Sequence, residues 1–429
     1  MLTAITGINW GDEGKGRMVD LLSQEYDIVV RYQGGNNAGH TVKNPRGKFV
    51  LNLLPSGILR PEVVCVMGNG MVIDPAHLEK EIASLREKGV AVSPANLKIS
   101  DRATICMPFH VEQDGLEEAR LSRTGAQFGS TKRGIAYSYG DKFMKKTLRM
   151  GDLLHLDEAM KQRLRTIVEA KNLTMVNGYG AKPVDLEELW AWCRKYGEMF
   201  RDYICDAGLY LDDADRAGKK ILFEAQLGAL RDSDFGIYPY TSSSNVISAY
   251  APIGAGIPGR RLDLSVGVMK AYSSCVGEGP FTAELAMTEE EKDCLREAGH
   301  EYGAATGRPR RVGPVDLVAS RYGVRCQGAD EIALTLLDVL DYMDVIPVVT
   351  RYRLADGTET EQFPMGEALD TAQPVVETLP GWHCDITGVR RFEDLPREAR
   401  DYVLYVEKAI GCRIAYISVG VDREAYIRR

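Results

Sequence analysis

The sequence lacks the cysteine pattern of a disulfide-rich or zinc-binding protein. Its nine cysteines are scattered and odd in number, and no two of them form a C-x-x-C pair. Disulfide scaffolds and common zinc sites need cysteines in even numbers or at fixed close spacings. We therefore expect reduced thiols that are buried or incidental, and a cytoplasmic location.

The sequence also lacks long apolar runs and an excess of basic charge. No stretch approaches the roughly 20 apolar residues of a membrane-spanning helix, and a strand-like pattern begins directly after Met1. We expect neither a signal peptide nor a membrane anchor. The net charge is −8, whereas a general nucleic-acid-binding protein carries a basic surface. Neither a membrane nor a nucleic acid is therefore an expected partner.

The sequence does contain short β-branched runs that alternate with helical stretches. The runs lie at 27–33, 48–54, 63–70, 219–225, 261–272, 344–352 and 413–420. This alternation predicts an α/β fold with a central, mostly parallel, twisted sheet flanked by helices. Because no linker or repeat interrupts residues 1–429, we interpret the chain as a single domain. Residues 152–215 are mostly helical in pattern with polar faces, and we predict a helical insertion there.

A glycine-rich loop follows the first apolar run, in the stretch ITGINWGDEGKGRMVDLL. A strand, a glycine turn and an amphipathic helix are typical of a phosphate-binding loop and of a P-loop-NTPase-like fold. The spacing is not that of a Walker A loop, because Asn9 replaces its first glycine and Gly16 replaces its hydroxyl residue. Gly11, Gly14 and Gly16 would still let the backbone approach a phosphate, and Lys15 at the helix start would favour the negative charge.

Asp12 is unusual in such a loop. A carboxylate repels phosphates unless it binds Mg²⁺ or accepts a proton, and the alternative is a solvated Asp-Glu pair in a plain turn. A second glycine cluster, RYQGGNNAGHT, follows the next strand and contains His40. A single histidine is more often structural or exposed, but a sheet would bring the two loops together. An acid and a base beside a phosphate site suggest catalysis.

Nine motifs occur in the order found in one enzyme family: WGDEGKG, GGNNAGHT, LPSGILR, GNGMVIDP, IYPYTSSSN, VGEGPF, TGRPRR, LDVLD and LPGWHCDITGVRRFEDLP. By these motifs the sequence resembles adenylosuccinate synthetase over essentially its whole length. The resemblance implies a ligase that joins IMP and L-aspartate, uses GTP and Mg²⁺, and forms adenylosuccinate, GDP and phosphate in AMP synthesis. It implies that O6 of the purine is phosphorylated first, and that the protein is a homodimer.

The resemblance also implies roles for individual residues. Asp12 matches the base that removes the N1 proton and a ligand of Mg²⁺, Gly39 matches a backbone ligand of Mg²⁺, and His40 matches the residue that hydrogen-bonds O6 and the moving phosphoryl group. The residues implied around IMP and aspartate are Asp12, Glu13, Gly14, Lys15, Asn37, Ala38, Gly39, His40, Thr131, Lys145, Gln226, Leu227, Ser242, Ala305, Thr306, Arg308 and Arg310. Those implied around GTP are Gly11, Asp12, Glu13, Gly14, Lys15, Gly16, Gly39, His40, Thr41, Arg310, Leu336, Asp338, Ser418, Val419 and Gly420.

Four of these positions match specific recognition groups. Thr131 matches a residue that binds the IMP phosphate. Arg308 and Arg310 match arginines that receive aspartate and neighbouring nucleotide groups, although three arginines in four residues would by themselves slightly favour a solvated basic loop. Two-point hydrogen bonding by a guanidinium suits a dicarboxylic substrate. Asp338 matches the carboxylate that accepts from guanine N1 and N2, a donor pair that adenine lacks.

The sequence departs from the family at several positions near the purine nucleotides. Leu336 stands for a Lys on the guanine, and Leu227 for a Gln near IMP, with Gln226 one residue earlier. Lys145 stands for an Arg that reaches the IMP phosphate of the partner subunit. Cys275 replaces an Arg, Asn36 a His and Ser242 a Thr.

Three hypotheses follow. The favoured one is an adenylosuccinate synthetase, because Asp12, His40, Thr131, Arg308, Arg310 and Asp338 are all present. The second is a divergent ligase that condenses aspartate with another 6-oxopurine nucleotide, such as GMP or dGMP, or that uses ATP. Asp12 counts against a different purine substrate, since phage relatives of that type have Ser at this position. The third is a nucleotide-binding paralogue without turnover.

Overall fold

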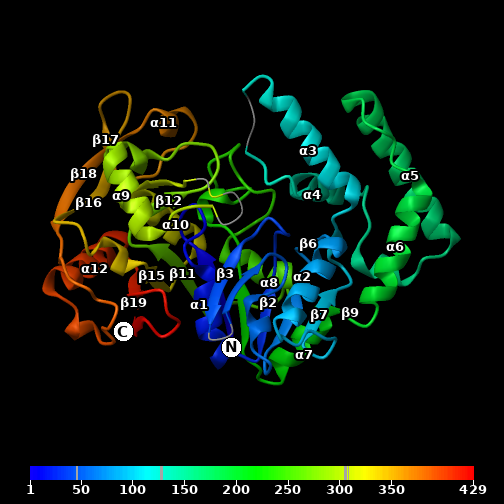
Figure 1. Cartoon of the computed structure of the whole chain (residues 1–429), viewed down its shortest axis with the longest axis horizontal. Helices are drawn as coiled ribbons and strands as arrows, with labels where there is room; N and C mark the ends of the chain where they lie inside the picture. Colours follow the sequence, from blue (N-terminus) through cyan, green and yellow to red (C-terminus); the bar gives the residue numbers. More distant parts are fainter. Residues whose placement is uncertain (45–46, 126–128, 304–306, 308) are drawn as a thin grey trace.

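The computed structural model describes residues 1–44, 47–125, 129–303, 307 and 309–429 (Figure 1). Its central feature is a sheet of ten strands in the order β20-β19-β15-β11-β1-β10-β2-β5-β7-β9. The strands are β1 (Leu2–Gly7), β2 (Ile28–Arg31), β5 (Val64–Met67), β7 (Leu97–Ser100), β9 (Ile204–Cys205), β10 (Ile221–Glu224), β11 (Leu264–Lys270), β15 (Glu331–Thr335), β19 (Arg413–Ser418) and β20 (Tyr426–Arg428). Every adjacent pair is parallel except β19 and β20.

Helices lie between these strands in the chain, so the predicted α/β fold with a mostly parallel sheet is confirmed. The helices are α1 (Lys15–Leu22), α2 (Pro75–Glu87), α3 (Pro108–Ser122), α4 (Ile135–Met144), α5 (Glu158–Asn172), α6 (Leu186–Phe200), α7 (Ala207–Arg216), α8 (Ala251–Ala255), α9 (Glu289–Gly299), α10 (Leu317–Gln327), α11 (Glu367–Asp370) and α12 (Arg397–Ile410). Within the described ranges, no helix has the length and apolar character needed to cross a membrane.

The central strands are apolar on both faces. In β2, Val29 packs into a core with Ile5 and Met18, whereas Ile28 and Val30 pack into a second core with α7 and α8. Parallel strands covered on both sides are expected to be continuously apolar, as the sequence IVVR nearly is. Both faces are thus closed, which leaves the ends of the strands for binding.

Two predicted strands do not belong to the central sheet. The run at 48–54 forms β4 (Gly47–Leu51), which pairs with β3 (His40–Asn44) in a hairpin. The run at 344–352 forms β16 (Val345–Arg353) in a second sheet with β14 (Val315–Asp316), β17 (Glu359–Thr360) and β18 (Gln373–Pro380). An apolar run predicts a strand but does not identify its pairing partner.

Short elements complete the fold. The two-stranded pairs are β6 (Val72–Ile73) with β8 (Thr104–Ile105), and β12 (Ser273–Cys275) with β13 (Arg311–Gly313). Single turns of helix that bear on the site are η2 (Ser56–Leu59), η5 (Ala229–Arg231) and η8 (Leu337–Leu340).

The range 152–215, predicted as a helical insertion, contains α5, α6 and α7 and the edge strand β9. Figure 1 shows α5 and α6 at the opposite end of the molecule from β16, β17 and β18. Lys171 on α5 reaches Asp141 on α4 and Gln113 on α3, at 2.8 Å each. The delimitation of this range as an insertion, within one domain, stays a prediction.

Candidate active site

The predicted site residues follow the carboxyl ends of neighbouring parallel strands. The loops after β1, β2, β10, β15 and β19 carry Asp12, Asn37, Gln226, Leu336 and Val419, respectively. In an open parallel sheet these ends share one edge, and ligands bind in the crevice outside it. Residues far apart in the chain are therefore collected at one edge of the sheet.

The first glycine loop has the backbone of an anion-binding turn. Gly11, Asp12 and Gly14 all have positive φ angles, of 106°, 58° and 97°. Helix α1 begins at Lys15, as predicted, and no side chain caps it. Its first N–H groups are therefore available to a phosphate, which the helix dipole also favours.

Glu13 and Lys15 support this loop from inside. Both side chains are 3% exposed, and Lys15 Nζ lies 2.6 Å from Glu13 Oε2. Glu13 Oε1 accepts from the backbone N–H groups of Asn9, at 3.1 Å, and Gly11, at 2.8 Å. The Glu13 carboxylate is thus engaged with the loop's own groups.

The second glycine loop brings His40 to the same helix end. A Cβ added to Gly16, in the first turn of α1, would lie 2.8 Å from Cβ of His40. Asp12 lies three residues before the start of α1, so both predicted catalytic groups border its amino end. Gly39, beside His40, is exposed, and Thr41 follows in β3.

His40 is paired with a buried carboxylate. His40 Nδ1 lies 2.5 Å from Oε1 of Glu224, at the end of β10, and Glu224 also accepts from the Ser56 N–H at 2.7 Å and the Ser56 hydroxyl at 2.6 Å. Since an ionised Glu224 can only accept, the proton of this bond is on Nδ1, and Nε2 is left for substrate.

The two partners have shifted pKa values. Burial lowers the pKa of His40, and the nearby charges of Arg31 and Lys15 add to this effect, against the opposing influence of Glu224. Burial alone would raise the pKa of Glu224, but its hydrogen bond to His40 and the charges of His40 and Arg31 give a net lowering. An anionic phosphate beside Nε2 would favour the protonated imidazole, because opposite charge favours the charged form.

Arg310 connects the first loop to a buried ionic cluster. Its Nη2 lies 3.0 Å from Asp12 Oδ2, and its Nη1 lies 2.8 Å from Glu301 Oε2. Glu301 Oε1 accepts from Lys270 Nζ and from the Tyr272 hydroxyl. The Asp12 side chain is 42% exposed, so it remains open to a ligand. The predicted residues Ala305, Thr306 and Arg308 lie outside the described residues.

The loop after β10 packs against both glycine loops. Gln226 is 1% exposed, and its Nε2 donates to Asn37 Oδ1 at 2.9 Å. A Cβ added to Gly11 would lie 3.3 Å from Cα of Leu227. Because β10 ends at Glu224, the one-residue shift of the glutamine lies in a loop, where it inverts no strand face. Leu227 has a φ of 62°.

Ala38 and Ser242 lie in the same region. Ala38 is buried, and its carbonyl accepts from Asn52 Nδ2 at 2.6 Å. Ser242 is half-buried, 3.2 Å from the hydroxyl of Ser244, which donates to Gln33 Oε1 at 2.9 Å. Gln33 Nε2 in turn donates to the Gln226 carbonyl at 2.9 Å. Ser242 is thus tied to the loop after β10 through a chain of side chains.

A carboxylate with an unpartnered oxygen lies near Arg17, in the first turn of α1. Among the described residues, the buried Oδ1 of Asp338 has no hydrogen-bond partner. Burial raises the pKa of Asp338, Asp341 and Asp385 add to this, and Arg17 opposes it. Arg17, on α1, donates to Ser418 Oγ at 2.7 Å. A buried acceptor without a donor is costly, which suits a carboxylate that binds a ligand.

Leu336 precedes Asp338 by two residues in the chain. Val419 and Gly420 follow β19, the strand that pairs with β15. Leu336 directly precedes η8 and has a φ of 60°. Val419 and Gly420 are buried, and Val419 N donates to the Ala425 carbonyl at 2.9 Å.

Two predicted residues lie apart from the glycine loops. Thr131 is exposed between α3 and α4, and Lys145 is exposed at the end of α4 with a φ of 62°. Within the described part of the chain, neither side chain forms a hydrogen bond or ion pair with the glycine loops. The same segment does approach them through Ile135, because a Cβ on Gly35 would lie 2.7 Å from its Cδ1.

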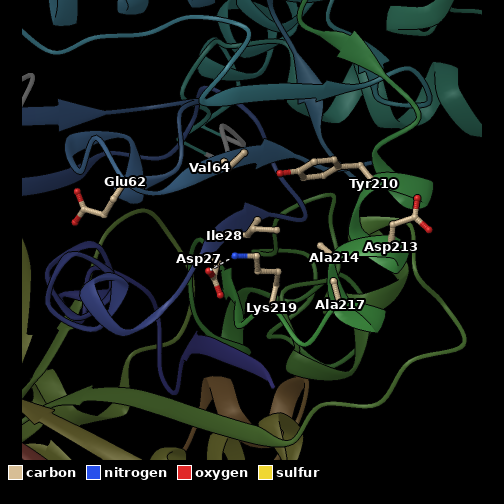
Figure 2. A pocket seen from close by; sticks show the side chains of 9 residues that line it. All are labelled: Asp27, Ile28, Glu62, Val64, Tyr210, Asp213, Ala214, Ala217 and Lys219. Atoms are coloured by element: carbon tan, nitrogen blue, oxygen red, sulfur yellow. Dashed lines mark hydrogen bonds and ion pairs between the residues drawn. The ribbon is translucent and has the colours of Figure 1, made fainter.

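A separate cavity lies away from these loops. The cavity has a volume of about 340 Å³. Figure 2 shows the side chains that line it: Asp27, Ile28, Glu62, Val64, Tyr210, Asp213, Ala214, Ala217 and Lys219. Ile28 and Val64 are the first residues of β2 and β5, so this cavity is at the amino edge of the parallel sheet. Since the glycine loops follow the carboxyl ends, the cavity is separate from the candidate site.

The buried residues that support the site were not predicted from the sequence; they include Glu224, Glu301, Lys270 and Arg17. A signal was available for Glu224, because a glutamate that ends the apolar run ILF is a charge at the end of a buried strand. The ionic cluster around Glu301 gives no comparable local signal, since its members lie in separate elements.

A family model described as adenylosuccinate synthetase matches residues 4–427. Relatives named adenylosuccinate synthetase include that of Caldanaerobacter subterraneus subsp. tengcongensis, 45% identical over 99% of this chain and 98% of the relative. Another, from Heliobacterium modesticaldum, is 45% identical over 99% of this chain and 97% of the relative. The fully ligated adenylosuccinate synthetase of Plasmodium falciparum has a TM-score of 0.92 and 35% identity, covering 100% of this chain and 99% of that one.

A further structure is similar at lower identity. The succinoaminodeoxyadenylate synthetase of cyanophage S-2L, bound to dGMP and dATP, has a TM-score of 0.59 and 18% identity, covering 100% of this chain and 95% of that one. At that identity the similarity shows the fold alone.

Proposed function

The chain belongs to the adenylosuccinate synthetase family, and we propose that the loops at the carboxyl edge of its sheet perform the family's reaction with Asp12 and His40 as the catalytic residues. The reaction joins IMP and L-aspartate to form adenylosuccinate. GTP is the co-substrate and yields GDP and phosphate. The observation that carries this proposal is that Asp12 and His40 border one uncapped helix end.

Asp12 is proposed as the base. It takes the proton from N1 of IMP, and the electron pair that is released increases the negative charge on O6. O6 then attacks the γ-phosphorus of GTP, forming an O6–P bond while the bond to GDP breaks. The amino group of aspartate attacks C6 of this 6-phosphoryl intermediate, loses a proton, and displaces phosphate.

His40 is proposed to act on the developing charge. Glu224 holds Nδ1–H, so Nε2 is the ring atom for O6 or the moving phosphoryl oxygens, and it donates to them once the anionic phosphate favours the protonated imidazole. A donor fixed before the reaction stabilises charge as it forms without reorganisation. The open first turn of α1 adds backbone donors for the phosphates.

Mg²⁺ is proposed as the metal, with Asp12 and the carbonyl of Gly39 as its ligands. Among the described residues, no group of three or more His, Cys, Asp or Glu side chains could hold a metal. Mg²⁺ is commonly held by one or two carboxylates together with substrate phosphates and waters, so a single exposed carboxylate fits it. When bound, it neutralises phosphate charge.

The remaining groups are proposed to select the substrates. The unpartnered Asp338 Oδ1 suits the N1–H and N2–H donors of guanine, which adenine does not offer. Arg310 is proposed to receive a carboxylate of aspartate, and Gln226, Leu227, Ser242 and Thr131 to surround IMP. Leu336 would cover the guanine face by apolar contact alone.

The test is turnover over a panel of nucleotides with purified protein, aspartate and Mg²⁺. We expect adenylosuccinate formation and phosphate release with IMP and GTP, and much less with ATP. Turnover with GMP or dGMP but not with IMP would instead support the divergent ligase. Binding without turnover across the panel would support the non-catalytic paralogue.

Two further properties are proposed from the resemblance of this chain to the family. The first is a homodimer in which Lys145 contacts the IMP phosphate of the partner subunit. The second is a cytoplasmic location, which the scattered unpaired cysteines support.

A further inference from the structure

A buried guanidinium near the purine-side residues has no role in the reaction steps above. Arg231, at the end of η5, is 8% exposed. Its Nη1 donates to the carbonyls of Tyr240 and, at 3.1 Å, Glu278. Its Nη2 donates to the carbonyl of Val276 at 2.7 Å and to Cys275 Sγ at 3.1 Å. One side chain therefore joins η5 to two other segments.

The loop that it holds has an unusual backbone. Gly277 and Gly279 have φ angles of 84° and 105°, and a Cβ on Gly279 would lie 2.7 Å from the Tyr240 ring. Such a turn leaves carbonyls without sheet partners, and those of Val276, Glu278 and Gly279 accept from arginine side chains instead. A guanidinium has five N–H donors in a fixed plane and can satisfy several at once. Within the described ranges, no carboxylate oxygen lies within 4.0 Å of the Arg231 nitrogens, and its four side-chain hydrogen bonds go to Tyr240 and to residues 275–278.

The same short helix touches segments on the IMP side of the site. The Arg231 carbonyl accepts from Ser242 N at 2.8 Å, and Leu230 N donates to the Asn9 carbonyl of the first glycine loop at 3.0 Å. A Cβ on Gly129, in the segment of Thr131, would lie 3.8 Å from Glu278 Cγ. A shift of the loop at 276–279 would therefore disturb the residues proposed around IMP, while Asp338 lies in η8 and Ser418 in β19.

Cys275 is the position at which the sequence departs from the family by loss of an arginine. It pairs with Arg311 across β12 and β13, is 2% exposed, and contacts the Arg231 guanidinium. A small side chain at 275 leaves this space to Arg231. Arg311 meanwhile donates to the Gly279 carbonyl at 2.7 Å from the other side.

We propose that Arg231 is a positioning residue for IMP, which supplies from η5 the guanidinium that family members carry at position 275. It holds the loop at 276–279 against Tyr240, and thereby fixes the Ser242 segment. This inference deepens the proposed function and rests on it. Its effect is specific to IMP, because the guanidinium has no contact with the groups proposed for guanine.

The test is a double-mutant cycle of wild type, Arg231→Leu, Cys275→Arg and the combined variant. We expect Arg231→Leu to raise the KM for IMP by at least about tenfold, as loss of several hydrogen bonds to a charged group predicts. The KM for GTP, measured with saturating IMP, stays at the wild-type value. Cys275→Arg alone also raises the KM for IMP, because two guanidiniums then compete for one space. The combined variant recovers most of the lost IMP affinity.

Several outcomes would overturn the inference. They are a combined variant no better than Arg231→Leu, an equal rise in the KM for GTP, or a neutral Cys275→Arg. Arg231→Lys, which keeps the charge but loses the planar fork, covers the case in which Arg231→Leu does not fold, and a wild-type KM for IMP in this variant would also refute the inference. Stabilisation of each protein by IMP in thermal unfolding gives the same comparison without turnover, so a failure of the proposed function is distinguishable.

Discussion

Several residues other than glycine near the site have a left-handed backbone conformation. Asp12, Leu227 and Leu336 have φ angles of 58°, 62° and 60°. The left-handed region suits glycine, asparagine and aspartate, and it costs a residue such as leucine of order 1–3 kcal/mol. Two of these residues are departures from the family pattern. The surrounding packing therefore sets the loop shape even where the side chain has changed.

Replacement of Asp12 by Asn tests the proposed base at this scale. Asn tolerates a φ of 58° and is close in shape to Asp, so the loop should keep its form. It cannot accept the N1 proton, and we expect kcat to fall by at least about 100-fold, within the usual range for loss of a general base. Calorimetry should show GTP binding retained. A variant with wild-type kcat would refute Asp12 as the base.

At the scale of elements, α1 is the unit on which the site depends. Its first turn meets His40 at Gly16, and Arg17 in the same turn donates to Ser418. Asp20, 2% exposed, pairs with Arg423 through two contacts at 2.6 and 2.7 Å. A helix of eight residues thus connects the catalytic loops with the segment proposed to hold guanine. Movement of α1 would disturb both.

Helix α10 begins at a buried carboxylate whose titration should be visible in stability. Asp316 accepts from Ala319 N at 2.9 Å and from the Tyr352 hydroxyl at 2.5 Å. Burial raises its pKa to about 6, from 3.8. The native state therefore binds this proton more tightly than the unfolded state. The free energy of unfolding should rise as the pH falls from above the folded pKa towards the unfolded one.

Comparison with Asp316→Asn isolates this contribution. Asn keeps an acceptor for Ala319 N and gains a donor for Tyr352, but does not titrate. The difference in unfolding free energy between variant and wild type should change by up to about 3 kcal/mol between about pH 7 and about pH 4. Denaturant unfolding at several pH values measures it. Parallel pH profiles for the two proteins would contradict the prediction.

Over the whole molecule, the sequence predicted the parts that depend on local pattern. The strand–loop–helix at residues 2–22 and the α/β class follow from periodicity and glycine placement, and both were correct. The pairing of β4 and β16 outside the central sheet was not predicted, because apolar character does not choose a partner. The identity of the substrates was inferred from the family resemblance, because sequence periodicity carries no information about them.

The buried residues that hold the site in place were harder to predict than the residues proposed to contact the substrates. His40 and Asp12 stand in recognisable glycine clusters, whereas Glu224 and Glu301 act through residues remote in sequence. Glu224 meets His40 across 184 positions, and Glu301 meets Lys270 across 31. Such pairs arise from strand order, which a single sequence leaves open.

The proposed dimer makes a prediction that involves two chains. Lys145 is exposed and left-handed at the end of α4, with no hydrogen bond to the glycine loops of its own chain within the described ranges. If it contacts the IMP phosphate of the partner subunit, Lys145→Ala should be impaired at low IMP, because a charged contact is lost. In a mixed dimer with inactive Asp12→Asn, however, the chain with intact Asp12 would receive a normal Lys145.

Adding excess Asp12→Asn should therefore raise the activity of Lys145→Ala per intact Asp12, at limiting IMP, towards that of wild type. The double variant Asp12→Asn/Lys145→Ala should give no such rise, since it has no lysine to offer, and wild type should be unchanged by Asp12→Asn. In the proposed symmetric dimer, each subunit contributes its Lys145 to the site of the other subunit. The activity of one site therefore depends on the residue at position 145 of the other chain. If the added Asp12→Asn subunit leaves the activity of Lys145→Ala unchanged, Lys145 contributes to the active site of its own chain or to neither site.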